Sequence, residues 1–374
     1  MLKKPIYISE LIYKHINNDK LNFLRDIDSK FLVGNPGFVG GARYGQVENN
    51  WDLHVPDSYL GPSLDIKSTA TFADITDARA IELQEKIKLS GKKLGVMWSG
   101  GIDSTTMITA CIRNFKNLDN VIVFMNNYSY YENATFFHDV IEKYNFDIIN
   151  IDENMLNERK GDFVITDGEP CDKLLTGGLA LKYQEKYPSD MNKYILSSKD
   201  NMINFITQYV DQKFAIRYFE LIQQNIKQTL APIETATDWF YWINFNFIWT
   251  GHMIRHYSRQ RYNKNTKNFD TFNTNTVNWF NTHEYQAWGF SEVGKQEKHF
   301  TNLSEYKMVA KRYIHSIAKD ESAMIYKTKC PSEYQYKRDE FRHKTLVIFD
   351  DGTGIDNNEP EKLQKFIEDY CLKQ

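Results

Sequence analysis

The stretch KLGVMWSGGIDSTTMITA, residues 93–110, decides how the rest of the chain is interpreted. Leu94 to Trp98 is a short, mostly apolar run with the length of one buried strand. The chain then passes through a turn with two glycines and continues with a helical spacing of apolar residues, at Met107, Ile108 and Cys111. We therefore expect a buried strand, a tight turn and a helix in direct succession.

The turn has the composition of a phosphate-binding loop. A turn that leads directly into a helix presents backbone N–H groups that have no partner within the helix, and the helix dipole favours an anion there. The hydroxyl groups of Ser99, Ser104 and Thr105 add donors, and Gly100 and Gly101 let a phosphate approach the backbone closely. A glycine-containing turn that binds no ligand is the alternative.

The segments around this stretch predict an α/β protein with a parallel sheet. Residues 72–90 have the spacing of a helix, with Asp74 or Thr76 as its N-cap. Further apolar runs at 121–125, 146–151 and 163–166 have the length of strands. Strands that alternate with helices at short spacing form parallel β-α-β units, whose carboxyl ends meet at one edge of the sheet. We expect a ligand to bind at that edge.

The composition is that of an ordinary globular protein. The chain has 374 residues, 41% of them hydrophobic, and a formal net charge of −3, which gives no global attraction to nucleic acid or to a membrane. No apolar segment has the length of a membrane span, and the N-terminus has no signal-peptide core. The four cysteines contain no CxxC pair, which fits a reducing cytosol. We expect a cytoplasmic protein without membrane contact.

A second, helical region follows the expected sheet. Residues 203–262 have a helical pattern and are unusually aromatic. These aromatic side chains could stack on bases, but they fall on several helix faces, which favours a hydrophobic core. We divide the chain into a small N-terminal region, an α/β core, a helical substrate-side region and a C-terminal strand and helix, at residues 1–70, 71–200, 201–335 and 336–374.

The six residues Ser99-Gly100-Gly101-Ile102-Asp103-Ser104 resemble the S-G-G-x-D-S loop of the PP-loop ATP pyrophosphatase superfamily. The two common nucleotide-binding motifs, G-x-x-x-x-G-K-[S/T] and G-x-G-x-x-G after a strand, do not fit this stretch. Enzymes of the PP-loop superfamily cleave ATP between its α- and β-phosphates, usually to adenylate a substrate. The resemblance implies ATP and Mg²⁺ as cofactors, bound to a parallel-sheet domain of the adenine-nucleotide-hydrolase type.

Two later stretches extend the resemblance to the synthetase domain of asparagine synthetases and β-lactam synthetases. Residues 166–173, TDGEPCDK, are similar to the family's G-E-G-[A/S]-D-E turn, and residues 327–329, KTK, are similar to its late R-x-K segment. In that family the aspartate of the turn lies near magnesium and pyrophosphate, and a late lysine neutralises the reacting phosphate. The resemblance implies the following site residues: Asp103 and Asp172 for the metal, Lys329 or Lys327 for catalysis, and Ser99, Gly100, Gly101, Asp103, Ser104, Thr105 and Gly168 for the nucleotide.

Asn126 ends the second expected strand, where it could meet the adenine or the ribose. The chain departs from the family at Pro170 and Cys171, which replace small residues, and at Lys173, which replaces a second acid. The family's late P-F-L-D motif is not evident. We therefore expect a substrate other than aspartate.

The resemblance implies an ATP-dependent adenylating enzyme that activates a carboxylate or amide oxygen for attack by a nitrogen nucleophile. Related amide-forming enzymes carry a glutaminase domain whose nucleophile is a cysteine after the initiator methionine. Here position 2 is Leu2, and no cysteine precedes Cys111. We therefore expect that a glutaminase domain is absent and that ammonia or an amine comes from elsewhere, such as a separate donor protein.

Two alternatives stay open. One is a PP-loop enzyme that modifies RNA or a nucleobase, with Cys171 as a persulfide carrier if the reaction is a thiolation. A basic cluster could then bind RNA phosphates, although a solvated helix face is the default interpretation of its residues, Arg255, Arg259, Arg261, Lys264 and Lys267. The other alternative is a nucleotide-binding module that has no catalytic activity.

Overall fold

The computed structural model describes residues 5–8, 66–151, 162–227, 229, 231–249, 262–263, 268–269, 276–319, 345–349, 354–356, 358–366 and 368–369. The chain divides into two compact units, each built from separate segments. The sheet unit comprises Leu64–Leu175 and Asn273–Lys337. The helical unit comprises Met1–Ser63, Thr176–Phe272 and Arg338–Gln374.

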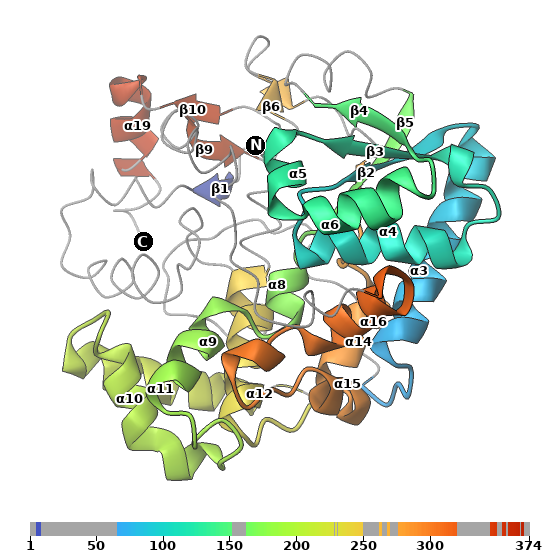
Figure 1. The fold of residues 1–374 in the computed structure, drawn as a ribbon. Coiled ribbons are helices and arrows are strands. Elements are labelled where there is room, and N and C mark those ends of the chain that lie inside the picture. Colours follow the sequence, from blue (N-terminus) through green and yellow to red (C-terminus); the bar gives the residue numbers. More distant parts are fainter. Residues whose placement is uncertain are drawn as a thin grey trace. The chain divides into compact units, whose positions relative to one another are not determined.

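The sheet unit contains a five-stranded sheet in the order β4-β3-β2-β5-β8, and all its neighbouring strands are parallel (Figure 1). This confirms the α/β class and the parallel sheet expected from the sequence. The strands are β2 (Lys93–Met97), β3 (Val121–Met125), β4 (Asp147–Asn150), β5 (Phe163–Asp167) and β8 (Thr276–Asn278).

The two faces of the sheet follow from the alternation of side chains along each strand. Ile122 and Phe124 of β3 pack with Phe163 and Ile165 of β5 in one buried cluster. Gly95 of β2 leaves room for this cluster, because a Cβ atom there would lie 2.1 Å from the ring of Phe124. The glycine inside the central strand therefore has a packing role.

Helix α3 (Phe72–Ser90) has the bounds that its sequence pattern predicts. Its N-cap is Thr71, however, and not Asp74 or Thr76. The Thr71 side chain accepts a hydrogen bond from the backbone N–H of Asp74, while the Asp74 carboxylate accepts one from the backbone N–H of Thr71. Asp74 is thus the acidic member of a capping box that begins three residues earlier.

The other helices of the sheet unit lie in the connections between its strands or in the segment after β8. They are η3 (Leu118–Asn120), α4 (Ile102–Asn114), α5 (Asn127–Glu132), α6 (Ala134–Phe136), η4 (Phe137–Glu142), α8 (Cys171–Leu174), α14 (His283–Phe290), α15 (Glu292–Glu297), η7 (Leu303–Glu305) and α16 (Met308–Ala318). Helix α4 packs against both α3 and α16. These three helices carry the contacts that position the site.

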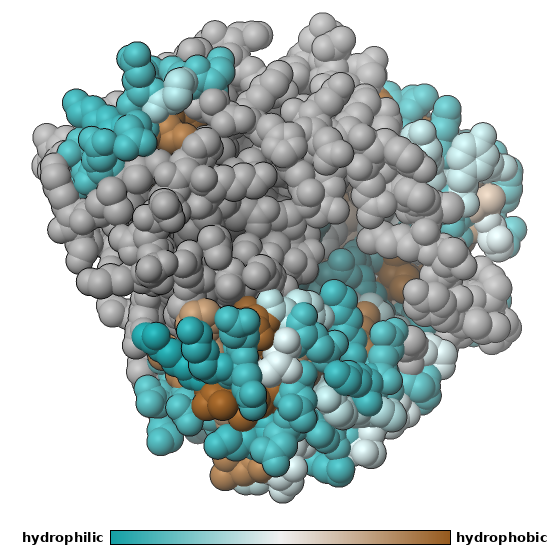
Figure 2. Space-filling view, turned by 90° about the vertical axis from the view of Figure 1, so that its left-hand side faces the viewer, coloured by the Kyte–Doolittle hydropathy of each residue, from teal (hydrophilic) through white to brown (hydrophobic). Residues whose placement is uncertain are grey.

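The helical unit has an aromatic core, as its sequence predicts. It contains α9 (Gly177–Lys186), η5 (Ile195–Ser198), α10 (Lys199–Ile206), α11 (Gln212–Ile226), α12 (Ala236–Ile243) and η6 (Asn244–Trp249). All seven aromatic side chains between 239 and 249 are buried, and the Phe240 ring lies 4.9 Å from that of Tyr183. The side of this unit that carries α10 and α11 is mostly hydrophilic, with scattered apolar areas (Figure 2). Core packing therefore accounts for the aromatic density.

The helical unit also contains two small antiparallel sheets and a late helix. One sheet has the order β1-β9-β10, from β1 (Pro5–Ile8), β9 (Thr345–Phe349) and β10 (Gly354–Asp356), and helix α19 (Pro360–Phe366) follows. The other pairs β6 (Tyr262–Asn263) with β7 (Asn268–Phe269). No helix within the described ranges combines the length and the apolar character needed to cross a membrane.

Candidate functional site

The two loops that carry the predicted site residues meet at the centre of the sheet. The chain passes from β2 to β3 and β4 on one side, and then returns to the other side of β2 as β5 and β8. In parallel sheets of this kind, ligands bind where the strand order reverses, beyond the carboxyl ends of the strands. Residues 99–104 follow β2, and residues 168–172 follow β5. Both loops therefore lie at the switch point.

The Ser99–Ser104 loop is held by its own hydroxyl groups. The Ser104 hydroxyl accepts a hydrogen bond from the Ser99 backbone N–H at 3.1 Å and donates one to the Gly101 carbonyl at 3.1 Å. The Ser99 hydroxyl lies 3.1 Å from that of Ser104. Gly101 is the N-cap of α4 and makes no side-chain cap hydrogen bond. The loop therefore has a defined shape, and its glycine N-cap does not provide α4 with the side-chain acceptor that a serine or aspartate there would supply.

Two glycines of the site lie where the packing leaves little or no room for a side chain. Gly100 has a φ of +81°, and a Cβ atom there would lie 2.4 Å from the carbonyl oxygen of Ser129. A Cβ atom on Gly168 would lie 3.1 Å from the Cβ atom of Asp103. The first glycine lets the loop pass close to α5, and the second brings the loop after β5 against the start of α4.

Thr105 and Asn126, which the sequence places among the nucleotide contacts, have protein partners. The Thr105 hydroxyl accepts a hydrogen bond from the Trp98 indole at 3.1 Å and is buried. The Asn126 side-chain oxygen caps α5 by accepting from the backbone N–H of Ser129 at 3.1 Å. Both side chains therefore make contacts within the protein where the chain leaves β2 and β3.

A charged cluster joins the loops at their aspartates. The Lys307 ammonium lies 2.5 Å and 2.8 Å from the two carboxylate oxygens of Asp103 and 2.5 Å from one oxygen of Asp172. The Lys307 side chain is 8% exposed, whereas that of Asp172 is 45% exposed. One nearly buried cation therefore holds two carboxylates from different loops, and one of these carboxylates reaches solvent.

The electrostatics of this cluster keep its lysine charged. Burial by itself would lower the pKa of Lys307, but the neighbouring charges of Asp103 and Asp172 raise it well above its usual value. Burial raises the pKa of Asp103, and the charge of Asp172 adds to this effect while that of Lys307 opposes it. The pKa of the adjacent Tyr306 is raised by burial, so its phenol stays neutral.

Lys307 was not predicted from the sequence. It is the N-cap of α16 and has left-handed backbone angles, φ 57° and ψ 24°, which are uncommon for a side chain of this size. The sequence signal available was a lysine directly before an amphipathic helix. That signal does not distinguish Lys307 from other lysines of the segment. The lysines that were predicted, Lys327 and Lys329, lie outside the described residues, as does the basic cluster at 255–267.

Cys171 lies beside the cluster but does not have the character of a reactive thiol. The side chain is buried, and burial together with the charge of Asp103 raises the pKa of the thiol well above its usual value. Reactive cysteines are accessible and have a lowered pKa. The surroundings of Cys171 therefore oppose the persulfide role.

The donor set fits a metal that arrives with a phosphate ligand. Among the described residues, no group of three or more histidine, cysteine, aspartate or glutamate side chains could hold a metal ion. Mg²⁺ in nucleotide sites is commonly bound by one or two carboxylates together with substrate phosphates and water. Asp103 and Asp172 are such a pair.

The fold and the site define an α/β protein with a charged cluster at the switch point of a parallel sheet. In comparisons with known proteins, no family model matches the sequence, and no curated protein matches it significantly.

Proposed function

We propose that this protein is an ATP-dependent adenylating enzyme of the asparagine-synthetase type, which forms AMP and pyrophosphate. The observation that carries the proposal is the Lys307 ammonium between Asp103 and Asp172, directly beside the S-G-G-x-D-S loop. A phosphate loop, two carboxylates and a buried cation are the groups that phosphoryl and nucleotidyl transfer require.

The sheet topology supports a nucleotide site at this position. In chain order the strands are arranged 3-2-1-4-5, which is the start of the strand order found in doubly wound nucleotide-binding sheets. The S-G-G-x-D-S loop follows the first of these strands, and the N-terminus of the 13-residue helix α4 follows the loop. The resemblance of this loop to the PP-loop favours cleavage between the α- and β-phosphates.

Each residue of the site has a role in this reaction. The backbone N–H groups at the start of α4 hold the pyrophosphate part of the nucleotide. Asp103 and Asp172 would hold Mg²⁺, and Lys307 would neutralise negative charge that develops on the leaving pyrophosphate. Bound MgATP would supply the α-phosphorus for attack by the substrate oxygen, with pyrophosphate as the leaving group. The acceptor is a carboxylate or an amide, and the nitrogen nucleophile that displaces AMP comes from a separate source.

The test measures which products ATP gives. ATP labelled at the α- and γ-phosphates is incubated with Mg²⁺, the protein and a cell extract as the source of acceptor. We expect acceptor-dependent AMP and pyrophosphate, and we expect Asp103→Asn to abolish both. Asp147→Asn is the matched control. Asp147 is the first residue of β4 and pairs with Lys93 at the amino ends of the strands, whereas the site lies beyond their carboxyl ends. This variant should react like the wild type.

Other products would identify other functions. ADP and inorganic phosphate would show that the bond between the β- and γ-phosphates is cleaved, which contradicts adenylation. Tight binding of α,β-methylene-ATP without AMP formation from ATP under any condition would favour the nucleotide-binding module. AMP formation that is lost after ribonuclease treatment of the extract would favour the RNA-modifying enzyme.

A further inference from the structure

The Lys307 ammonium lies where a divalent cation would bind. It contacts carboxylate oxygens of Asp103 and of Asp172, each at 2.5 Å, which are the oxygens that a metal between the two loops would need. A metal ion and an ammonium group cannot share this position, because both require the same acceptors and repel each other. The lysine and the metal therefore compete for one pair of carboxylates.

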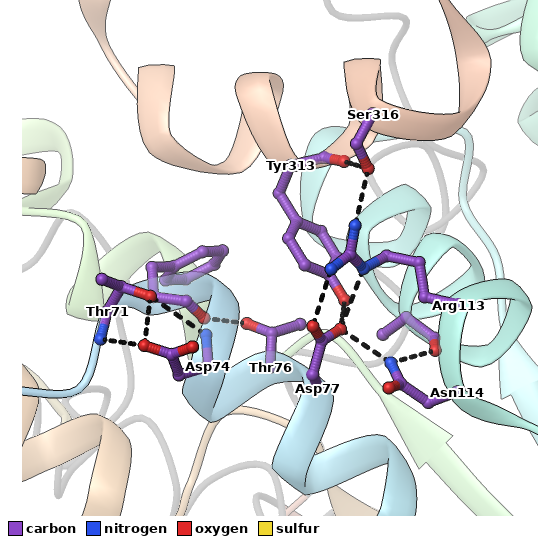
Figure 3. Close-up of polar contacts among 10 residues, drawn as sticks. Thr71, Asp74, Thr76, Asp77, Arg113, Asn114, Tyr313 and Ser316 are labelled. Atoms are coloured by element: carbon purple, nitrogen blue, oxygen red, sulfur yellow. Dashed lines mark hydrogen bonds and ion pairs between the residues drawn. The ribbon is translucent and has the colours of Figure 1, made fainter.

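Helix α16, which begins directly after Lys307, is held against α3 and α4 towards its far end. There Arg113 of α4 donates two hydrogen bonds to Asp77 of α3, at 3.0 Å and 2.8 Å, and the Tyr313 hydroxyl of α16 donates to Asp77 at 2.5 Å (Figure 3). Arg113 also donates to the Ser316 hydroxyl at 3.2 Å. We call these four residues the clamp.

The clamp and the charged cluster join α4 to α16 at both ends. Asp103 lies in the first turn of α4 and meets the residue before α16, whereas Arg113 lies in the last turn and meets Ser316 near the end of α16. The two helices therefore lie side by side in the same direction, with a defined register. A departure of the Lys307 ammonium from the carboxylates by a change of side-chain torsion would leave this register intact.

We propose that Lys307 is a tethered substitute for a divalent cation. Without nucleotide, its ammonium occupies the Asp103–Asp172 pair and keeps free metal ions out. The metal binds together with a nucleotide, and the Lys307 ammonium then pairs with phosphate oxygens of that nucleotide. The proposal rests on the proposed function only in naming a nucleotide as the phosphate ligand.

The free energy of desolvation explains why metal binding and nucleotide binding are coupled. A metal that enters alone must displace a nearly buried ammonium, and a buried charge without a partner is unfavourable. Phosphate oxygens provide the displaced ammonium with new partners, so the metal and the nucleotide each increase the affinity of the site for the other. Coupling of this kind is reciprocal and can be measured from either ligand.

The test uses Mn²⁺ as the probe and electron paramagnetic resonance to count the bound ions. We expect little binding of Mn²⁺ to the wild-type protein alone, and stoichiometric binding in the presence of α,β-methylene-ATP. Lys307→Met should bind Mn²⁺ without nucleotide at least about tenfold more tightly than the wild type. Lys307→Asn is a second variant without the ammonium, chosen because asparagine tolerates the left-handed backbone, and it should gain affinity in the same direction.

Two controls assign the gained affinity to the carboxylate pair. Lys311→Met removes another buried lysine from the same helix, whose ammonium donates to the Ser304 carbonyl at 2.8 Å. Because the charges of Lys311 and Lys307 repel each other, this variant should bind Mn²⁺ at most slightly more tightly than the wild type, with a much smaller gain than Lys307→Met. Adding Asp172→Asn to Lys307→Met should remove the gained site.

Three results would overturn the proposal. They are tight Mn²⁺ binding by the wild type without nucleotide, equal affinity of the wild type and Lys307→Met, and no binding by either Lys307 variant. Failure of the proposed function is a separate outcome. If the Lys307 variants gain the Mn²⁺ site while no AMP is ever formed from ATP, then Lys307 excludes metal from a site whose chemistry is not adenylation.

Discussion

Gly100 combines a left-handed backbone with a lack of space for any side chain. Its φ is +81°, and an added Cβ atom would lie 2.4 Å from the Ser129 carbonyl oxygen and 2.8 Å from Cβ of Glu132. Gly100→Ala must therefore shift the loop away from α5 or strain its backbone. We expect a loss of about 2 kcal/mol in the free energy of unfolding and a loss of affinity for α,β-methylene-ATP, measured by denaturation and calorimetry.

Gly178→Ala is the control for this substitution. An added Cβ atom at Gly178 meets nothing within 4 Å, and the residue lies in the first turn of helix α9. Alanine should leave the stability unchanged or raise it by up to about 1 kcal/mol, because a helix favours alanine over glycine. Equal behaviour of the two variants would mean that Gly100 is not constrained as the structure shows.

Cys171 should resist alkylation in the folded protein. Its side chain has no exposed surface, and burial raises the pKa of the thiol well above its usual value, so that the reactive thiolate is scarce at pH 8. We expect iodoacetamide to modify Cys171 in guanidinium chloride but not in buffer, as measured on the peptide by mass spectrometry. Rapid modification in buffer would restore the persulfide role as a candidate.

The residues of the site differ in how far the sequence could reveal them. Asp103 and Asp172 belong to short motifs next to strands, so the topology brings them to one edge of the sheet. Lys307 belongs to no motif and reaches Asp103 across 204 positions of sequence, through a packed helix. Its role depends on the register of α16 along α4, and no local pattern in the sequence encodes that register.

At the scale of the helices, the clamp should contribute measurably to stability. Asp77 accepts hydrogen bonds from Arg113, Asn114 and Tyr313, and its side chain is 24% exposed. Asp77→Asn removes the charge that these donors share and should cost about 2 kcal/mol, whereas Tyr313→Phe should cost about 1 kcal/mol. Glu85→Gln on the same helix is the control, because its contact with Lys88 is exposed and contributes little. Chemical denaturation measures all three effects.

The contribution of Asp77 should depend on pH in acid. Burial alone would raise the pKa of Asp77, but hydrogen bonds from Arg113, Tyr313 and Asn114 hold it below the usual value. The folded state therefore releases the proton more readily than the unfolded state, whose pKa is about 3.9. The resulting stability is fully present above the unfolded-state pKa and is lost as the pH falls through the lower pKa of the folded state. The difference in unfolding free energy between wild type and Asp77→Asn should be constant from about pH 5 to pH 8 and fall below about pH 4. A difference that increases in acid would contradict this assignment.

The elements of the sheet unit were predictable where their signal is local. Helix α3 and strands β2, β3 and β5 are visible as apolar patterns, and the structure confirms them. Strand β8 was missed because its three residues, Thr276–Asn278, have no apolar pattern. It exists as a strand because it pairs with β5, which is remote in sequence, and because Asn278 donates a hydrogen bond to the Asp167 carboxylate at 2.7 Å.

At the scale of the whole molecule, the described parts of the site all belong to one of the two units. The loop at 99–104, Asp172 and Lys307 lie in the sheet unit, whereas the aromatic core of α12 and η6 lies in the helical unit. A ligand that binds only the folded site stabilises it by about 2.7 kcal/mol at a concentration a hundred times its Kd. Protection by a nucleotide should therefore fall on the sheet unit.

Hydrogen exchange with and without Mg²⁺ and α,β-methylene-ATP measures this distribution. We expect the slowest amides of β2, α4 and α16 to exchange about a hundredfold more slowly with the nucleotide, because they become accessible only when the site opens. The amides of α10, α11 and α12 should keep their rates. In Asp103→Asn, the nucleotide should no longer protect the sheet unit. Without nucleotide, the helical unit of this variant should exchange as in the wild type. Equal protection of both units would mean that the nucleotide binds elsewhere or that the two units open together.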